Sequence, residues 1–267
     1  GIISGSTGIT KIGSGTLTLS GTNTYTGGTA ISGGTLIAAN NSALGATSSG
    51  ISIASGTVLD LLNIALGSNP ITLAGGTLKD ATSSAAGNII LTANSTLSTT
   101  IASDVFELSG VISESSGSYG LTITGAGTIV LSGANTYTGG TRISSGVLSV
   151  STGGASGSNL SSGTLTIGGG SLVASTTGNT ISNAITLATG SNKIAAATGT
   201  SVTFSGIISG AGTGALAVGD ATNNGTITFS GANTYTGGTA ITGTTLSVAS
   251  GGTSGSNLSS GAVTLTG

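Results

Sequence analysis

The chain lacks the side chains on which most enzyme chemistry depends. Its 267 residues include no Cys, His, Met or Trp and a single Pro, and only 4% of them are charged and 3% aromatic. Without imidazole or thiolate groups, the usual catalytic dyads and triads and the soft-metal sites cannot be built. We therefore expect no enzymatic activity, no cofactor and no bound metal. The missing thiols also exclude disulfides, which is compatible with an exported protein but does not prove export.

Charge is almost absent as well, which excludes two classes of partner. Six acids and four bases give a formal net charge of −2. Nucleic-acid binding needs a basic face, and so does binding to an anionic membrane surface. No apolar run approaches the roughly 18 residues of a membrane helix. We expect no nucleic-acid partner, and membrane attachment only through a part of the protein that lies outside this sequence.

Small polar residues dominate what is present. The chain contains 51 Gly, 44 Ser and 48 Thr, so more than half of it consists of these three types. Such a composition is frequent in disordered linkers, but disorder usually accompanies low hydrophobicity and high net charge. Here 36% of residues are hydrophobic and the mean hydropathy is +0.46. These values favour an ordered chain with enough Ile, Leu and Val to line a core.

A long internal repeat divides the sequence into modules. The segments SGTNTYTGGTAISGGTL, SGANTYTGGTRISSGVL and SGANTYTGGTAITGTTL begin at Ser20, Ser132 and Ser230 and agree at 11 of 17 positions. We interpret residues 1–267 as one continuous solenoid of three modules, 1–109, 110–205 and 206–267, which open with GIIS, GVIS and GIIS. The third module is truncated and the first residue is Gly1, with no signal segment before it. We expect a piece of a longer polypeptide.

A shorter period predicts the fold. A small residue followed by a Thr-aliphatic pair, or a similar one, recurs fifteen times at intervals averaging about 19 residues. Apolar and hydroxyl residues alternate around it, as in GTLTLS from Gly15, which is typical of strands with one buried face. Frequent Gly argues against helices. The prediction is an all-β parallel β-helix of about fourteen rungs, with Thr and Ser outside and one buried ladder made by Leu17, Leu36, Val58, Leu78 and Leu97.

The residues KIGSGTLTLSGTNTYTGGTAISGGTL, from Lys11 to Leu36, resemble the autotransporter-associated β-strand repeat of Gram-negative passenger regions. Residues 123–148 and 218–246 are similar, the latter with an inserted DATNN stretch. The resemblance implies a right-handed parallel β-helix at the cell surface or outside the cell, with a signal peptide upstream and an outer-membrane barrel downstream. Export and anchoring rest on this resemblance alone.

The conserved-looking core of the repeat contains one Tyr and one Asn in each module. We interpret Tyr25, Tyr137 and Tyr235 as packing residues at a repeated corner, because they lie too many rungs apart to form one ligand platform. Asn23, Asn135 and Asn233 are predicted to bond the backbone at that corner. The Gly pair that follows, for example Gly27 and Gly28, indicates a positive φ at the turn. No phosphate-binding loop motif occurs.

One pair of acids merits attention as a catalytic candidate. Asp60 and Asp80 each follow a strand start by three residues, which predicts one register on neighbouring rungs, and paired acids on β-helix rungs can act as general acid and base. Because stacked buried carboxylates would be costly, we favour a solvated corner with Lys79 between them. We therefore predict no catalytic residues. The remaining acids, Asp104, Glu107, Glu114 and Asp220, are scattered.

Three functions are compatible with this sequence. A structural stalk or fibre segment explains the uniform repeat and is our preferred hypothesis; its partners would be further repeats or neighbouring copies, stacked end to end or side by side. An adhesin that binds a host or surface polymer would need a stretch that breaks the pattern, and residues 58–71 and 103–119 are the candidates. A polysaccharide-acting enzyme would have to use Asp60 and Asp80.

Overall fold

The computed structural model describes residues 1–151, 160, 162–210, 215–249, 258 and 261–266, and every regular element among them is a β-strand. The chain divides into two compact units, Gly1–Gly139 and Gly140–Gly267. In each unit the strands pair in parallel and form three sheets, so the chain winds as a β-solenoid. The predicted all-β parallel β-helix is confirmed.

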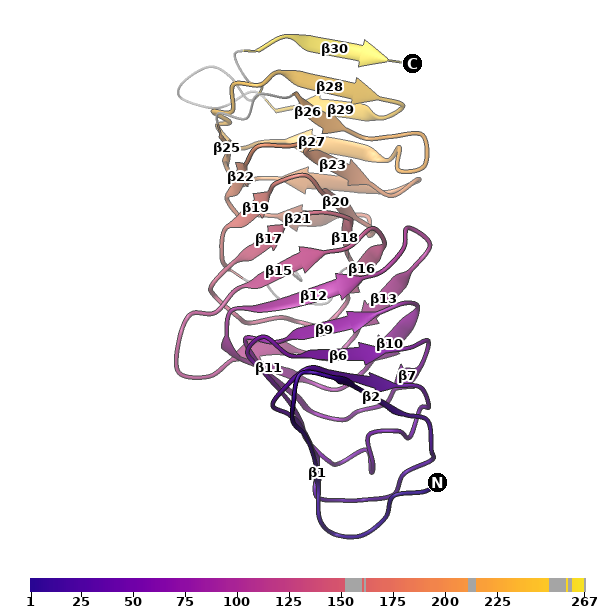
Figure 1. Cartoon of the computed structure of the whole chain (residues 1–267). Helices are drawn as coiled ribbons and strands as arrows, with labels where there is room; N and C mark the ends of the chain where they lie inside the picture. The colour runs from indigo at the N-terminus through magenta and orange to yellow at the C-terminus, as the bar shows by residue number, and fades with distance from the viewer. Residues whose placement is uncertain (152–159, 161, 211–214, 250–257, 259–260, 267) are drawn as a thin grey trace. The chain divides into compact units, whose positions relative to one another are not determined.

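The first unit has sheets 1, 2 and 3. Sheet 1 contains β1 (Ile9–Lys11), β3 (Thr29–Ile31), β5 (Ile51–Ala54), β8 (Ile71–Ala74), β11 (Ile89–Ala93) and β14 (Ile112–Glu114). Sheet 2 contains β2 (Thr16–Leu19), β4 (Thr35–Ala38), β6 (Val58–Leu61), β9 (Thr77–Asp80), β12 (Ser95–Thr99) and β15 (Leu121–Thr124). Sheet 3 contains β7 (Ala65–Leu66), β10 (Ser83–Ala85), β13 (Val105–Leu108) and β16 (Thr128–Leu131). Figure 1 shows β6, β9, β12 and β15 stacked one above the other.

The second unit has sheets 4, 5 and 6. Sheet 4 contains β17 (Thr141–Ile143), β19 (Leu165–Ile167), β22 (Ile185–Leu187) and β25 (Ile208–Ser209). Sheet 5 contains β18 (Val147–Val150), β20 (Ser171–Ala174), β23 (Lys193–Ala196), β26 (Leu216–Val218), β28 (Thr239–Thr242) and β30 (Val263–Thr266). Sheet 6 contains β21 (Asn179–Ile181), β24 (Ser201–Phe204), β27 (Thr226–Phe229) and β29 (Thr245–Val248). Phe204 and Phe229 lie on the inner face of sheet 6 and pack edge to face, with ring centroids 6.0 Å apart.

The turns are longer than the sequence period suggests. In-register partners are separated by as few as 18 residues, from Ile71 to Ile89, and by as many as 26, from Ser95 to Leu121. The described residues form about eleven turns, so the prediction of about fourteen rungs is too high. The error arises because the sequence beat does not stay on one sheet. After Leu97 in sheet 2 the next two beats fall on Ile112 in sheet 1 and Ile129 in sheet 3.

The aliphatic ladder of sheet 2 is part of the core of the first unit. Its strand β6 is offset by one residue from the predicted alignment. Leu36, Leu78 and Leu97 are fully buried and belong to this ladder, and their partner in β6 is Leu59. Leu17 is in register with Leu36 but is 37% exposed, so its predicted burial is wrong. Val58 pairs with Thr35 and Thr77 on the outer face, so its predicted burial in the ladder is wrong. The cause is Thr57. Its hydroxyl donates to the carbonyls of Ala54 at 2.8 Å and Ile31 at 3.2 Å, which turns this corner residue inward and shifts the strand by one position.

A column of glycines lets successive turns touch at the corner between sheets 3 and 1. A Cβ on Gly110 would lie 2.1 Å from the carbonyl oxygen of Gly87, and a Cβ on Gly133 would lie 2.2 Å from that of Gly110. The same arrangement occurs in the second unit, where Gly231 faces the carbonyl of Gly206. At these contacts no side chain fits between the two backbones. The glycines that open the second and third modules, Gly110 and Gly206, therefore have a steric cause.

Candidate functional site

The residues that recur most strictly lie in the NTYT segments, which we define as residues 23–26, 135–138 and 233–236. Each Asn side chain is buried and joins two turns. The Oδ1 atom of Asn23 accepts from the backbone N–H of Ile3 at 2.9 Å, and its Nδ2 donates to the carbonyl of Ala43 at 2.7 Å. Asn135 accepts from Ile112, and Asn233 from Ile208, both at 2.8 Å. The predicted backbone-bonding role of the three asparagines is confirmed.

The tyrosines of these segments are core residues. Tyr25, Tyr137 and Tyr235 are at most 1% exposed. The hydroxyl of Tyr25 lies 2.6 Å from Oγ1 of Thr29, and that of Tyr235 lies 2.7 Å from Oγ1 of Thr239. A buried phenol needs such a partner, because an unsatisfied hydroxyl in the core is costly. No tyrosine of the three is available for ligand stacking, as the sequence predicted.

Both glycines that follow each tyrosine are required, for different reasons. The second has a positive φ, 85° at Gly28 and 82° at Gly238, which glycine adopts without strain. The first has no room for a side chain, since a Cβ on Gly27 would lie 2.1 Å from the backbone nitrogen of Gly8. The predicted positive φ is thus confirmed for the second glycine, and backbone contact explains the first glycine of the first two modules, Gly27 and Gly139.

Within the first unit, the two NTYT segments stand on different sides of the solenoid. Residues 23–26 lie between β2 of sheet 2 and β3 of sheet 1. They are on the side of the solenoid where sheet 3 lies in the following turns, from β7 onward. Residues 135–138 follow β16 of sheet 3 and stack on β14 of sheet 1, where Thr136 donates its N–H to the carbonyl of Ile112 at 2.9 Å. The motif therefore advances by one side, or a third of a turn, between the first and second modules.

Glu114 replaces a backbone acceptor at the second of these segments. In the first and third modules the N–H groups of Thr26 and Thr236 donate to the carbonyls of Gly5 and Gly210. In the second module the N–H of Thr138 donates to Oε1 of Glu114 at 3.0 Å, and the Thr138 hydroxyl donates to the same atom at 2.6 Å. Oε2 accepts from the N–H of Tyr119 at 2.7 Å. The sequence analysis missed this role.

The charge of Glu114 makes this clamp dependent on pH. Partial desolvation would raise the pKa of Glu114, but hydrogen bonds from Thr138 and from the backbone N–H of Tyr119 outweigh it, so its pKa lies below the ordinary value. A carboxylate with a lowered pKa stabilises the fold above its unfolded pKa, about 4.3, and this contribution is lost as the pH falls through the folded pKa.

We expect Glu114→Ala to accelerate amide hydrogen exchange at Thr138 and Tyr119 at neutral pH, with little change in global stability, because the clamp is at the surface. The matched control is Glu107→Ala, since Glu107 lies on the outer face of β13, away from the motif. Unchanged exchange at Thr138 in Glu114→Ala would show that the carboxylate does not hold the segment.

Asp60 and Asp80 do not form a catalytic pair. Asp60 is in register with Lys79, and its Oδ2 lies 2.7 Å from the lysine Nζ on the outer face of sheet 2. Asp80 is in register with Leu61 and is fully buried on the inner face. The two carboxylates point to opposite sides of the sheet, so they cannot act on one substrate. The predicted shared register and the predicted solvated corner for Asp80 are both wrong. The one-residue shift at Thr57 explains the first error, whereas Asp80 faces inward because the regular alternation of β9 places it there.

The remaining charged groups serve local structure. Asp104 is buried, and its Oδ2 accepts from the N–H groups of Thr100 and Ile101 at 2.8 and 2.7 Å. Asp220, in the inserted DATNN stretch, accepts from Thr222 and Asn223 and pairs with Lys193 at 3.1 Å. Desolvation would raise the pKa of Asp220, but these partners hold it well below the usual range.

Lys11 is a second residue whose role the sequence analysis missed. It is 7% exposed, and its Nζ donates to the carbonyls of Ile12, Gly13 and Gly33 at 2.8 to 2.9 Å. The ammonium group therefore closes a corner of the first unit with three backbone oxygens. The sequence signal for this role was the place of Lys11 in the alternation of β1, where an inward-facing residue is expected.

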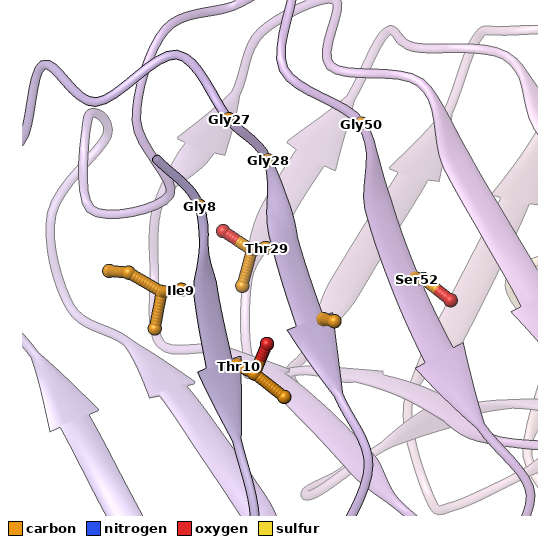
Figure 2. A pocket seen from close by; sticks show the side chains of 9 residues that line it. Gly8, Ile9, Thr10, Gly27, Gly28, Thr29, Gly50 and Ser52 are labelled. Atoms are coloured by element: carbon orange, nitrogen blue, oxygen red, sulfur yellow. The ribbon is translucent and has the colours of Figure 1, made fainter. Parts of the chain in front are cut away.

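Two shallow hollows lie on the outside of the first unit. One, of about 400 Å³, covers the starts of β1, β3 and β5. Figure 2 shows why it is hollow: Gly8, Gly27, Gly28 and Gly50 line its upper part, and the labelled side chains around it are short or aliphatic. None of its lining residues is charged or aromatic. The other, of about 340 Å³, is lined by Asn63, Ile64, Ala65, Thr82, Ser83, Ser84, Val105 and Glu107.

Glu107 is the one charged residue among those that line these two hollows. Among the described residues, no three acids lie close enough to hold a metal ion. In the same part of the chain, no helix is long and apolar enough to cross a membrane. Apart from Asp80, which lies on the inner face of sheet 2, the charged side chains described above lie at corners or on outer faces, and the recurrent asparagines join turns.

Comparison with known proteins identifies the repeat. The model of the passenger-associated-transport-repeat matches residues 9–38, 121–150 and 221–248, each of which contains one NTYT segment with its flanking strands. No curated protein and no solved structure matches the chain. The buried Asn and Tyr, the glycine pair and the parallel strands around them are therefore the structure of this repeat, and the chain is a β-solenoid with three passenger-associated-transport-repeats of the autotransporter type.

Proposed function

We propose that this chain is a structural segment of an autotransporter passenger, a β-helical stalk that is displayed at the surface of a Gram-negative bacterium or outside it. The observation that carries the proposal is the use of the recurrent motif. Asn23, Asn135 and Asn233 are buried and bond the backbone of a neighbouring turn, and the three tyrosines fill the core. The asparagines and tyrosines of the motif thus hold turns together in the interior, and the exposed side chains that the motif presents to solvent are threonines.

The outer faces support the same proposal. The residues that project from sheet 2 are mostly hydroxyl-bearing, and the Asp60–Lys79 pair neutralises its own charges. A surface with little net charge has little electrostatic repulsion between neighbours. The partners that fit it are further repeats of the same chain or neighbouring copies, stacked end to end or side by side.

A length experiment tests the stalk directly. The full passenger is displayed on cells with an epitope at its outer end, once as it is and once with residues 1–267 present in two tandem copies. At roughly 4.8 Å per turn, eleven additional turns should raise the epitope by about 50 Å, as measured by cryo-electron tomography. An unchanged epitope height in correctly displayed, folded protein would contradict a stalk.

An adhesin is the second candidate, because the 340 Å³ hollow lies where the sequence pattern is least regular. Its lining takes Asn63 to Ala65 from the candidate stretch 58–71, and Val105 and Glu107 from the stretch 103–119. A small neutral or weakly basic sugar would meet Ser84, Thr82 and one carboxylate there. A glycan array probed with the isolated chain and with Ser84→Trp, which fills the hollow, separates the two functions. Binding that Ser84→Trp abolishes would favour the adhesin.

A further inference from the structure

One ionisable side chain in the first unit is enclosed without a partner. Asp80 ends β9 on the inner face of sheet 2 and is 0% exposed. Its in-register neighbours are Leu61 on one turn and Thr99 on the other, neither of which carries a charge. A buried carboxylate normally has an opposite charge or several N–H donors to compensate its lost hydration. Asp80 has neither arrangement.

The polar groups beside Asp80 form their hydrogen bonds with other partners. Both of its carboxyl oxygens are buried and have no hydrogen-bond partner. The hydroxyl of Ser83 donates to the carbonyl of Leu61 at 3.0 Å, and Oγ1 of Thr99 accepts from the N–H of Gly127 at 2.9 Å. The cation closest in sequence, Lys79, points to the opposite face and pairs with Asp60. The protonated form of Asp80 therefore suits this site better than the carboxylate.

We propose that Asp80 makes the first unit a pH-sensitive part of the solenoid, in which the turns around β9 are firmly packed when its carboxyl is protonated and weakened when it is ionised. The proposal does not depend on the stalk function. The segment would then be most stable at mildly acidic pH. A carboxylate that is paired in the folded state has the reverse effect, because protonation in acid removes its contribution to stability.

The electrostatics agree with this geometry. Burial raises the pKa of Asp80 to about 6. The Ser83 hydroxyl and the backbone N–H groups of Ala81 and Ser83 lie close enough to lower it in part, although none of them makes a hydrogen bond to the carboxyl, and the charge of Asp104 adds a smaller upward effect. The other charged groups around it are Asp60 and Lys79, paired outside β6 and β9, and Glu107, outside β13. Histidine, the side chain that usually titrates between pH 5 and 8, does not occur in the chain.

The sign and the size of the effect follow from linkage. A carboxyl whose pKa is raised by folding binds its proton more tightly in the folded state. The resulting stability is fully present below the unfolded pKa, about 3.9, and is lost as the pH rises through the folded value of about 6. Between pH 8 and pH 5 the unfolding equilibrium constant of the region should therefore fall about tenfold.

Urea unfolding of the full chain at pH 5 and pH 8 tests the proposal. The wild type should be more stable at pH 5, by about tenfold in the equilibrium constant. Asp80→Asn keeps the shape of the side chain without the charge, and it should be at least as stable as the wild type at pH 8 with no difference between the two pH values. Asp80→Leu continues the apolar column begun by Leu61 and should behave in the same way.

Asp60→Asn is the matched control, because it removes a carboxylate from the outer face one turn away and should keep the wild-type pH dependence. Three results would overturn the proposal: a wild type that is equally stable at both pH values, a pH dependence that survives in Asp80→Asn, or failure of both Asp80 variants to fold, which would make the carboxylate itself a requirement of the structure.

Discussion

Leu59→Asp should unfold the turns around β6, with a loss of stability of about 4 kcal/mol or more. Leu59 is 0% exposed and lies between Leu36 and Leu78 in the inner ladder of sheet 2. The substitution removes a large apolar side chain and places an unpaired carboxylate where no donor compensates it, and these are the two costliest kinds of core change. Urea unfolding monitored by circular dichroism measures the loss.

The neighbouring substitution Val58→Asp is the control, because the same carboxylate is then added one position away on the outer face. It should cost no more than about 1 kcal/mol, since Val58 pairs with Thr35 and Thr77 outside the core and Lys79 lies on the same face. Equal effects of the two substitutions, or a larger effect at Val58, would mean that the register of β6 is shifted by one residue from the one described above.

Gly110→Ala should cost about 2 to 4 kcal/mol although it adds a single methyl group. The new Cβ would lie 2.1 Å from the carbonyl oxygen and 2.5 Å from the carbonyl carbon of Gly87. Both atoms belong to the backbone of the adjacent turn, so no side-chain rotation relieves the clash and the two turns must separate. A thermal unfolding scan is sufficient to detect an effect of this size.

Gly50→Ala is the matched control in the same unit. A Cβ on Gly50 meets nothing within 4 Å, and the residue does not have a positive φ, so the substitution should change stability by no more than about 0.5 kcal/mol. If Gly110→Ala were as well tolerated as Gly50→Ala, the turns could not be in the backbone contact that the glycine column requires.

The fold class was predictable because the alternation of apolar and polar residues with a period of two indicates strands whatever number of turns is assumed. The pairs Leu17–Leu19 and Ile227–Phe229 alternate with Thr, and the strands β2 and β27 lie there. The number of turns was not predictable from the same signal. Most turns consist of two or three short strands of similar composition, so the sequence does not distinguish the next strand from the strand one turn later.

The candidate site shows the same division. The roles of Asn135 and Tyr25 followed from the residue types at a glycine-rich corner, because a buried amide or phenol there has the backbone and Thr hydroxyls within reach. The environment of Asp80 did not follow. Thr57 shifts β6 by one position and places Asp60 on the outer face, so the stacking of two buried carboxylates that argued against an inward Asp80 does not occur.

The displacement of the NTYT segment by one side between the first two modules has a consequence for how such a protein lengthens. The three sheets of the first unit share short parallel strands with aliphatic residues on the inner face, so a copied stretch that ends a third of a turn further on still meets strands with which it can pair. Gene duplication by unequal crossing-over is then free of the requirement that the inserted DNA encode whole turns. Recombination can add or remove sequence that covers a single side of the solenoid, and the parallel strand pairing continues across the junction.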